Sequence, residues 1–184
     1  MSEYNVYLVP VDEPTSGRRG IGDRVLASLE RREIISAFYD EELGWYAAGP
    51  KSRDLFTDVT SEGPAFEYAI IYDRQEAHFV PDSQTAGFGA RCSGCQADLD
   101  EEVYELLEEQ GEGEEVIDVA GRKLNCSKCR LPNPLATLKA EIDTAVTRFY
   151  VNFCAVDSFN LNPEILDELQ KIVGTKFRLV GERL

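Results

Sequence analysis

Two short cysteine motifs constrain this chain more than any other feature of its sequence. Cys92 and Cys95 form one C-x-x-C pair, Cys126 and Cys129 form a second, and thirty residues lie between the pairs. Four thiolates in two such pairs are the usual ligand set of a tetrahedral zinc ion. Because four sulfurs leave no open position for water or substrate, the predicted role of one zinc per chain is structural. Binding of the ion would also fold the segment that carries the cysteines.

The cysteine turns and their short β-like flanks resemble those of the zinc-ribbon class, in which two cysteine turns at hairpin tips hold one zinc ion. The resemblance covers residues 90–131 only and rests on the four cysteines. Many zinc-ribbon turns have glycine directly after the second cysteine. This chain has Gln96 and Arg130 at those positions, and Gly94 lies inside the first turn instead. What the resemblance implies is a small structural zinc module.

Two other chemistries use the same cysteine motif. Iron in a rubredoxin-like site also takes four cysteine ligands, and sulfur ligation alone does not separate the two ions. A C-x-x-C pair also serves as the redox dithiol of thioredoxin-like enzymes, where a single pair lies at a helix N-terminus. Here a second pair accompanies the first, which favours one shared metal ion over two unrelated dithiols.

Negative charge is concentrated between the two cysteine pairs. The chain has a formal net charge of −15, and residues 98–115 contribute ten carboxylates and no Lys or Arg, so the remainder has a net charge of −5. Such a field repels nucleic-acid phosphates and anionic lipid headgroups, which makes a protein with a basic surface the expected partner. Two interpretations stay open. The segment is either a solvated helix face, with Val103, Leu106 and Leu107 on its buried side, or a docking surface.

Hydrophobic periodicity elsewhere predicts alternating strands and helices. Strands are expected at residues 4–11, 66–72, 78–80, 148–156 and 176–180, with a hairpin turn at 73–77 and a further small hairpin over 115–125 that delivers the second cysteine turn. Helical patterns cover residues 23–36 and 101–109. Asn133-Pro134 and Asn162-Pro163 each place a good N-cap before a proline, which predicts two more helix starts.

The predicted fold is therefore α+β, a mixed sheet with helices packed on it, interrupted by a small zinc-ribbon-like insertion. Residues 1–89 and 132–184 are expected to form one α+β domain together. Residues 90–131 are expected to form the inserted four-cysteine zinc module, with an acidic helix and loop. Hydrophobic residues make up 43% of the chain, which suffices for a core.

A cytoplasmic location without a membrane partner is expected. No basic segment followed by an apolar stretch opens the sequence, and no window approaches the roughly 18 apolar residues of a membrane span. Four of the five cysteines belong to the metal pattern, and Cys154 is the one cysteine outside it. That usage fits a reducing compartment better than a disulfide framework.

The leading functional prediction is a zinc-stabilised adaptor that binds another protein through its acidic surface and is not an enzyme. The runner-up is an enzyme or small-ligand binder with a cleft beside the zinc module, for which Arg18, Arg19 and His78 would be the first residues to test. A nucleic-acid-binding zinc ribbon is the third, disfavoured by the charge. No catalytic or cofactor-binding residue is predicted, because the single histidine has no nucleophile motif near it.

Overall fold

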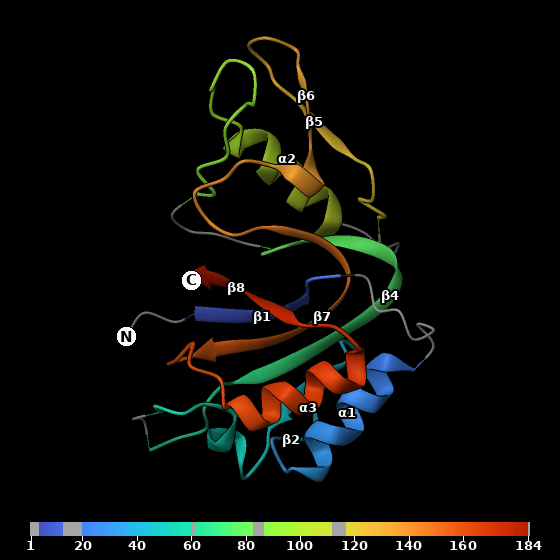
Figure 1. Ribbon diagram of the computed structural model, residues 1–184, viewed down its shortest axis with the longest axis vertical. Helices are drawn as coiled ribbons and strands as arrows, with labels where there is room; N and C mark the ends of the chain where they lie inside the picture. The colour runs from blue at the N-terminus through green and yellow to red at the C-terminus, as the bar shows by residue number, and fades with distance from the viewer. Residues whose placement is uncertain (1–3, 13–19, 60–61, 83–86, 112–116, 184) are drawn as a thin grey trace. The chain divides into compact units, whose positions relative to one another are not determined.

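The computed structural model of the chain describes residues 4–12, 20–59, 62–82, 87–111 and 117–183 (Figure 1). Backbone proximity divides the chain into two compact units. The first unit comprises residues 1–73 and 149–181, and the second comprises residues 74–148 and 182–184. The expected inserted module, residues 90–131, falls within the second unit, and its exact limits stay a prediction.

Antiparallel pairing dominates the main sheet. Among the described residues this sheet has six strands in the order β2-β3-β4-β7-β1-β8. In chain order they are β1 (Tyr4–Pro10), β2 (Ile35–Asp40), β3 (Trp45–Ala48), β4 (Tyr68–Val80), β7 (Ala145–Val156) and β8 (Phe177–Arg183). The pairs β1 with β7, β2 with β3 and β3 with β4 are each antiparallel. Strands β4 and β7 carry residues of both units.

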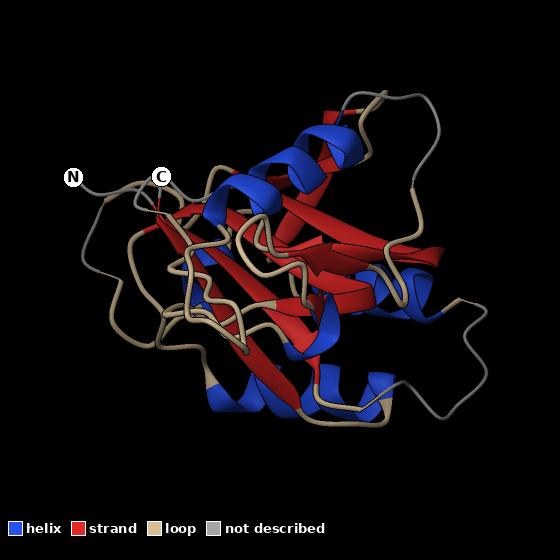
Figure 2. Ribbon diagram, turned by 90° about the horizontal axis from the view of Figure 1, so that it is seen from above, coloured by secondary structure: helices blue, strands red, loops and turns tan. Residues whose placement is uncertain are grey.

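Three α-helices accompany the sheet in the described part of the chain, shown in blue against the red strands in Figure 2. They are α1 (Ile21–Arg31), α2 (Asp100–Gly111) and α3 (Pro163–Val173), and two short 3-10 turns occupy Ser52–Leu55 and Leu135–Thr137. These elements confirm the predicted α+β class. Within the described residues, no helix combines the length and the apolar character needed to cross a membrane.

The core of the first unit joins the sheet to helices α1 and α3. Strand β1 lies between β7 and β8 and has five successive buried residues. The cluster contains pairs of fully or almost fully buried side chains from β1, α1 and α3, namely Val6, Leu8, Val25, Leu29, Ile165 and Leu169. On each helix the paired residues are four apart, so they lie on one face.

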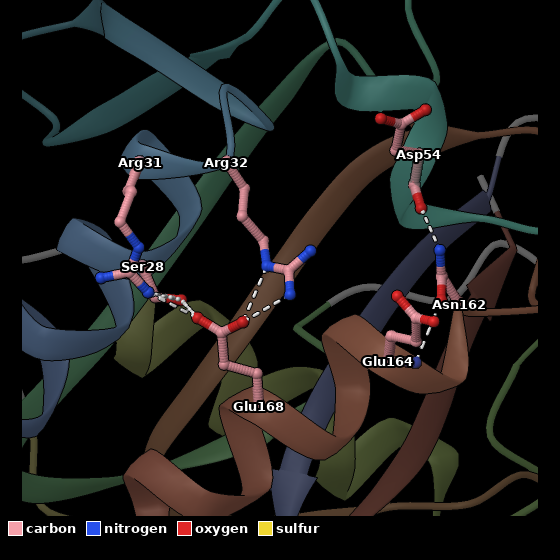
Figure 3. Close-up of polar contacts among 7 residues, drawn as sticks. All are labelled: Ser28, Arg31, Arg32, Asp54, Asn162, Glu164 and Glu168. Carbon is pink, nitrogen blue, oxygen red and sulfur yellow. Dashed lines mark hydrogen bonds and ion pairs between the residues drawn. The ribbon is translucent and has the colours of Figure 1, made fainter.

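Glu168 of α3 connects this helix to α1, which lies beside it (Figure 3). One carboxylate oxygen accepts hydrogen bonds from Ser28 Oγ and from Arg31 Nη2, the latter at 2.6 Å. The other oxygen accepts from Arg32 Nε at 2.8 Å. The Ser28 hydroxyl and then the Arg32 guanidinium stabilise the charged carboxylate and lower the pKa of Glu168 to about 2.

Helix α3 has the caps that its sequence predicts. Asn162 Oδ1 accepts the backbone N–H of Glu164 at 3.0 Å, and Pro163 occupies the first turn (Figure 3). Gly174 ends the helix in the left-handed conformation, with φ of 84°. Asn162 Nδ2 also donates to the backbone oxygen of Asp54 at 2.9 Å, which ties the start of the helix to the first 3-10 turn.

The second unit packs α2 on a smaller core. Leu99, Val103 and Leu106 are buried in a cluster with Phe79 and Phe88. At the start of α2 the Asp100 carboxylate accepts the backbone N–H groups of three successive residues, Phe88, Gly89 and Ala90, at 3.0, 3.2 and 2.7 Å. Part of the predicted acidic segment therefore stabilises the fold itself.

The hairpin expected to turn at residues 73–77 was wrong, because β4 continues through them from Tyr68 to Val80. The polar run that suggested a turn has partners along the strand instead. Asp73 Oδ2 accepts the N–H of Gly22 at 2.8 Å, and the N–H of Ala77 donates to Asp118 Oδ1 at 2.9 Å.

The helix expected after Asn133-Pro134 was also wrong. Residues Pro132–Pro134 form strand β6, and only the short 3-10 turn Leu135–Thr137 follows. Asn133 is buried, and its side chain bonds to Ser93 and Leu131 rather than capping a helix.

The second hairpin lies further along the chain than expected. Strand β5 (Lys123–Asn125) pairs antiparallel with β6 across the second cysteine turn, so the cysteines themselves occupy the hairpin tip. Of the expected range 115–125, residues 115 and 116 lie outside the described residues, and 117–122 form no strand.

Candidate metal centre

The second unit brings the four predicted cysteines together. The sulfur atoms of Cys92, Cys95, Cys126 and Cys129 all lie within 4.8 Å of one another. The Sγ atoms of Cys92 and Cys129 are 3.5 Å apart, and those of Cys95 and Cys126 are 3.7 Å apart. With metal–sulfur bonds of about 2.3 Å, a tetrahedral site has sulfur–sulfur edges of about 3.8 Å. The four cysteines can therefore hold one metal ion.

The two cysteine turns have the same backbone hydrogen bonds. The N–H that follows the second cysteine donates to the carbonyl of the first, from Gln96 to Cys92 at 3.0 Å and from Arg130 to Cys126 at 2.8 Å. The N–H of the first cysteine donates to the carbonyl of the residue five positions later, from Cys92 to Ala97 at 2.8 Å and from Cys126 to Leu131 at 3.1 Å. Each turn thus presents two sulfurs on the same side.

Gln96 and Arg130 adopt the conformation that glycine would adopt. Their φ angles are 59° and 62°, in the left-handed region, where a side chain costs about 1 kcal/mol. The Gln96 side chain offsets part of this cost, because its Nε2 donates to the Cys92 carbonyl at 3.1 Å. The chain departs from the zinc-ribbon pattern in residue type, but the backbone has the conformation for which glycine is suited.

Gly94 allows the two turns to approach. A Cβ atom at this position would lie 2.7 Å from Leu131 Cδ2 and 3.9 Å from Cys129 Sγ. The first distance is below any normal carbon–carbon contact, so a larger residue would displace Leu131.

Side chains outside the turns fix each one in place. Asn133 Oδ1 accepts the backbone N–H of Ser93 at 2.8 Å, and Glu102 Oε1 accepts that of Ser127 at 3.2 Å. The Asn133 Nδ2 atom lies 3.7 Å from Cys92 Sγ and is a donor to that sulfur. Sequence reasoning missed Asn133 as a supporting residue, because Asn-Pro indicated a helix start.

Without a metal ion, the pKa values of Cys92 and Cys129 shift in opposite directions. Backbone N–H groups of Cys95 and then Gly94 donate to the Cys92 sulfur and lower the pKa of Cys92 to about 6. The N–H of Leu131 lowers the pKa of Cys129, but the neighbouring sulfurs of Cys95 and Cys92 outweigh it and raise that pKa to about 12. Close thiolates repel one another, so a divalent cation is what would let all four lose their protons.

Much of the acidic segment is occupied within the unit. Asp98 pairs with Arg91 at 2.8 Å, and Glu109 pairs with Arg122 at 2.5 Å. Glu112, Glu114 and Glu115 lie outside the described residues. Of the remaining carboxylates, three are exposed and make no hydrogen bond or ion pair with any described residue, namely Glu101, Glu105 and Glu108.

A groove of about 290 Å³ lies between α2 and β5, directly before the second cysteine turn. Its two walls carry opposite charges, with the carboxylates on α2 and the cations on the β5 side, and the lining residues are Glu102, Glu105, Leu106, Glu109, Arg122, Lys123, Leu124 and Asn125. Glu102 and Glu109 are engaged by Ser127 and Arg122, as described above. Glu105 lies between them on the same helix face and keeps its carboxylate unpaired among the described residues.

The other predicted residues lie elsewhere. Arg18 and Arg19 are outside the described residues, and His78 lies on β4, where burial lowers its pKa. Cys154 is buried on β7 in the first unit, whereas the four clustered cysteines belong to the second unit. The Asp73 carboxylate accepts the Gly22 N–H and so places a negative charge at the start of α1.

Three features of the second unit bear on function, namely the cysteine cluster, its supporting side chains and the groove beside it. The cluster gives the chain a place for one metal ion. The groove gives it a surface with an unpaired carboxylate. Comparison of the chain with protein-family models, with curated proteins and with solved structures found no match in any of the three.

Proposed function

We propose that this chain is a zinc-stabilised module that binds a basic segment of another protein in the groove between α2 and β5. Zinc is favoured because sulfur-only tetrahedral sites with all four positions filled by protein are typical of structural zinc. None of the five cysteines forms a disulfide, which favours a reducing compartment, and on that ground we place the protein in the cytoplasm.

The observation that carries the proposal is the position of β5. This strand supplies one wall of the groove through Arg122–Asn125 and runs directly into Cys126. The opposite wall, α2, is joined to the second cysteine turn by the hydrogen bond from Ser127 to Glu102. A metal ion that fixes this turn would hold both walls at their present spacing, so metal binding and partner binding become linked.

The charges of the groove favour a cationic ligand. Three carboxylates, Glu102, Glu105 and Glu109, face two cations, Arg122 and Lys123, so the lining keeps one negative charge in excess. Arg122 is already paired with Glu109. The unpaired Glu105 carboxylate is left to receive a lysine or arginine from a partner. Long-range attraction by the acidic segment would speed association at low salt.

The first experiment is metal analysis of protein purified without chelator. We expect one zinc per chain. Iron at the same stoichiometry, or no metal together with four titratable thiols in the folded protein, would contradict the zinc assignment.

The second experiment measures binding of a fluorescent octalysine peptide by anisotropy. Glu105→Lys should weaken binding about tenfold, because it reverses the unpaired charge in the groove. Glu108→Lys is the matched control, since it makes the same change in net charge on α2 outside the groove lining. Equal effects of the two variants would exclude the groove as the binding site, and tighter retention of duplex DNA than of octalysine at moderate salt would contradict the proposed partner.

A further inference from the structure

A stacked group of aromatic side chains lies on β2, β3 and β4 of the first unit, and we call Tyr39, Trp45 and Tyr68 the aromatic edge. The rings of Trp45 and Tyr68 stack with centroids 4.4 Å apart and planes 5° apart. Tyr39 stacks on Tyr68 at 5.2 Å and 27°. Tyr39 is 50% exposed and the nearby Leu43 is 57% exposed, so both side chains face solvent at the edge of the sheet.

Carboxylates lie on β2, in the turn after it and directly before β4, next to residues of the aromatic edge. Glu67 Oε1 accepts the Tyr39 hydroxyl at 2.7 Å. Asp40 closes the following turn by accepting the N–H of Leu43 at 3.0 Å, and Glu41 and Glu42 are exposed with no hydrogen bond or ion pair from their side chains to any described residue. Residues 34–50 and 54–73 contain no Lys, Arg or His.

The shape of the edge decides how a ligand would be recognised. Strand β2 ends the sheet, and its pairing with β3 shifts register twice, between Ile35 and Phe38 and again between Phe38 and Asp40. Such irregularities interrupt the row of backbone groups that an added strand needs. Recognition at this edge therefore falls to side chains.

We propose that the aromatic edge binds an arginine side chain presented by a partner protein. A guanidinium group stacks on an exposed aromatic ring and donates hydrogen bonds to a carboxylate in the same plane, and Glu67 and the Glu41-Glu42 turn supply such acceptors. Lysine has no planar face to stack and holds its water more tightly, so it suits this surface less well. The proposal does not depend on the groove in the second unit.

The single tryptophan of the chain, Trp45, reports binding directly. The full chain is titrated with a short peptide containing two arginines and with its two-lysine counterpart. We expect a saturable change in Trp45 emission, with the arginine peptide binding about fivefold more tightly than the lysine peptide. Glu67→Gln should weaken the arginine peptide about threefold or more, because it removes one charge beside Tyr39.

Tyr39 separates stacking from hydrogen bonding. Tyr39→Ala should weaken the arginine peptide about fivefold, whereas Tyr39→Phe keeps the ring and should stay within about twofold of the wild type. Glu105→Lys, which targets the groove, should leave the Trp45 response unchanged. Equal affinity for the two peptides, insensitivity to both Tyr39→Ala and Glu67→Gln, or a saturable response to maltohexaose alone would overturn the proposal.

Discussion

The ion-pair cluster around Glu168 gives a stability prediction with a defined pH dependence. In Glu168→Gln the side chain keeps its shape but loses its charge, and with it the attraction to Arg31, the last residue of α1, and to Arg32 directly after it (Figure 3). A fall in pKa from 4.5 to about 2 would correspond to about 3 kcal/mol for a fully shielded group. The Glu168 side chain is 26% exposed and that of Arg31 is 68% exposed, so screening by water reduces the expected loss to about 1 kcal/mol.

The sign of the pH dependence follows from the direction of the pKa shift. The folded state holds the pKa of Glu168 below its ordinary value of 4.5, so the folded protein binds this proton more weakly than the unfolded chain. The stabilising contribution is therefore complete above pH 4.5 and is lost as the pH falls toward about 2. Wild type and Glu168→Gln should differ at pH 7 and converge at low pH.

Urea unfolding followed by Trp45 emission is the appropriate measurement, because the only tryptophan lies in the first unit with α1 and α3. Asp167→Asn is the matched control. This neighbour on the same helix is exposed and makes no hydrogen bond or ion pair with any described residue, so its neutralisation should change the unfolding free energy by less than about 0.5 kcal/mol. A difference between Glu168→Gln and wild type that stays constant from pH 7 to pH 3 would refute the electrostatic explanation.

Two further predictions concern the second unit. Removing the metal with a strong chelator should increase amide hydrogen exchange in both cysteine turns, where the N–H groups of Cys92 and Cys126 are internally bonded. The same treatment of the control variant Cys154→Ser should give the wild-type result. Unchanged exchange in the turns would contradict a structural metal. Asp100→Ala should lower the unfolding free energy by more than about 2 kcal/mol, because three backbone N–H groups lose their acceptor. The control Glu101→Ala, at the exposed neighbour, should lower it by less than about 0.5 kcal/mol. Urea unfolding followed by circular dichroism measures both, and similar effects of the two variants would contradict this account.

The contrast between Asn162 and Asn133 explains how far local sequence predicted the fold. Both residues precede proline, and both predicted a helix. Asn162 caps α3 as expected, because its neighbours continue with an apolar stripe that packs on the core. Asn133 is instead buried beside the cysteine cluster, where Ser93 and Leu131 use its side chain. The contact with Ser93 joins residues forty positions apart in the chain, which no local pattern contains.

The edge of the sheet was the other element that the sequence did not predict. Neither β2 nor β3 alternates cleanly between apolar and polar residues in sequence, so no strand pattern stands out. This matches the structure, in which all four residues of β3 are only partly buried and the register between β2 and β3 is broken. Strand β4 was divided into two because its polar residues resemble a turn. The clustering of the four cysteines was predictable because C-x-x-C spacing pairs them locally, whereas the groove depends on how α2 meets β5.

The left-handed conformations of Gln96 and Arg130 bear on how such centres are recognised in other chains. A motif that requires glycine after the second cysteine would pass over this sequence, although its turns have the dihedral angles for which glycine is usually chosen. Residue identity is only a proxy for those angles. A description based on φ, on the N–H that returns to the first cysteine and on the small residue between facing turns would include chains in which a hydrogen-bonded glutamine replaces the missing glycine.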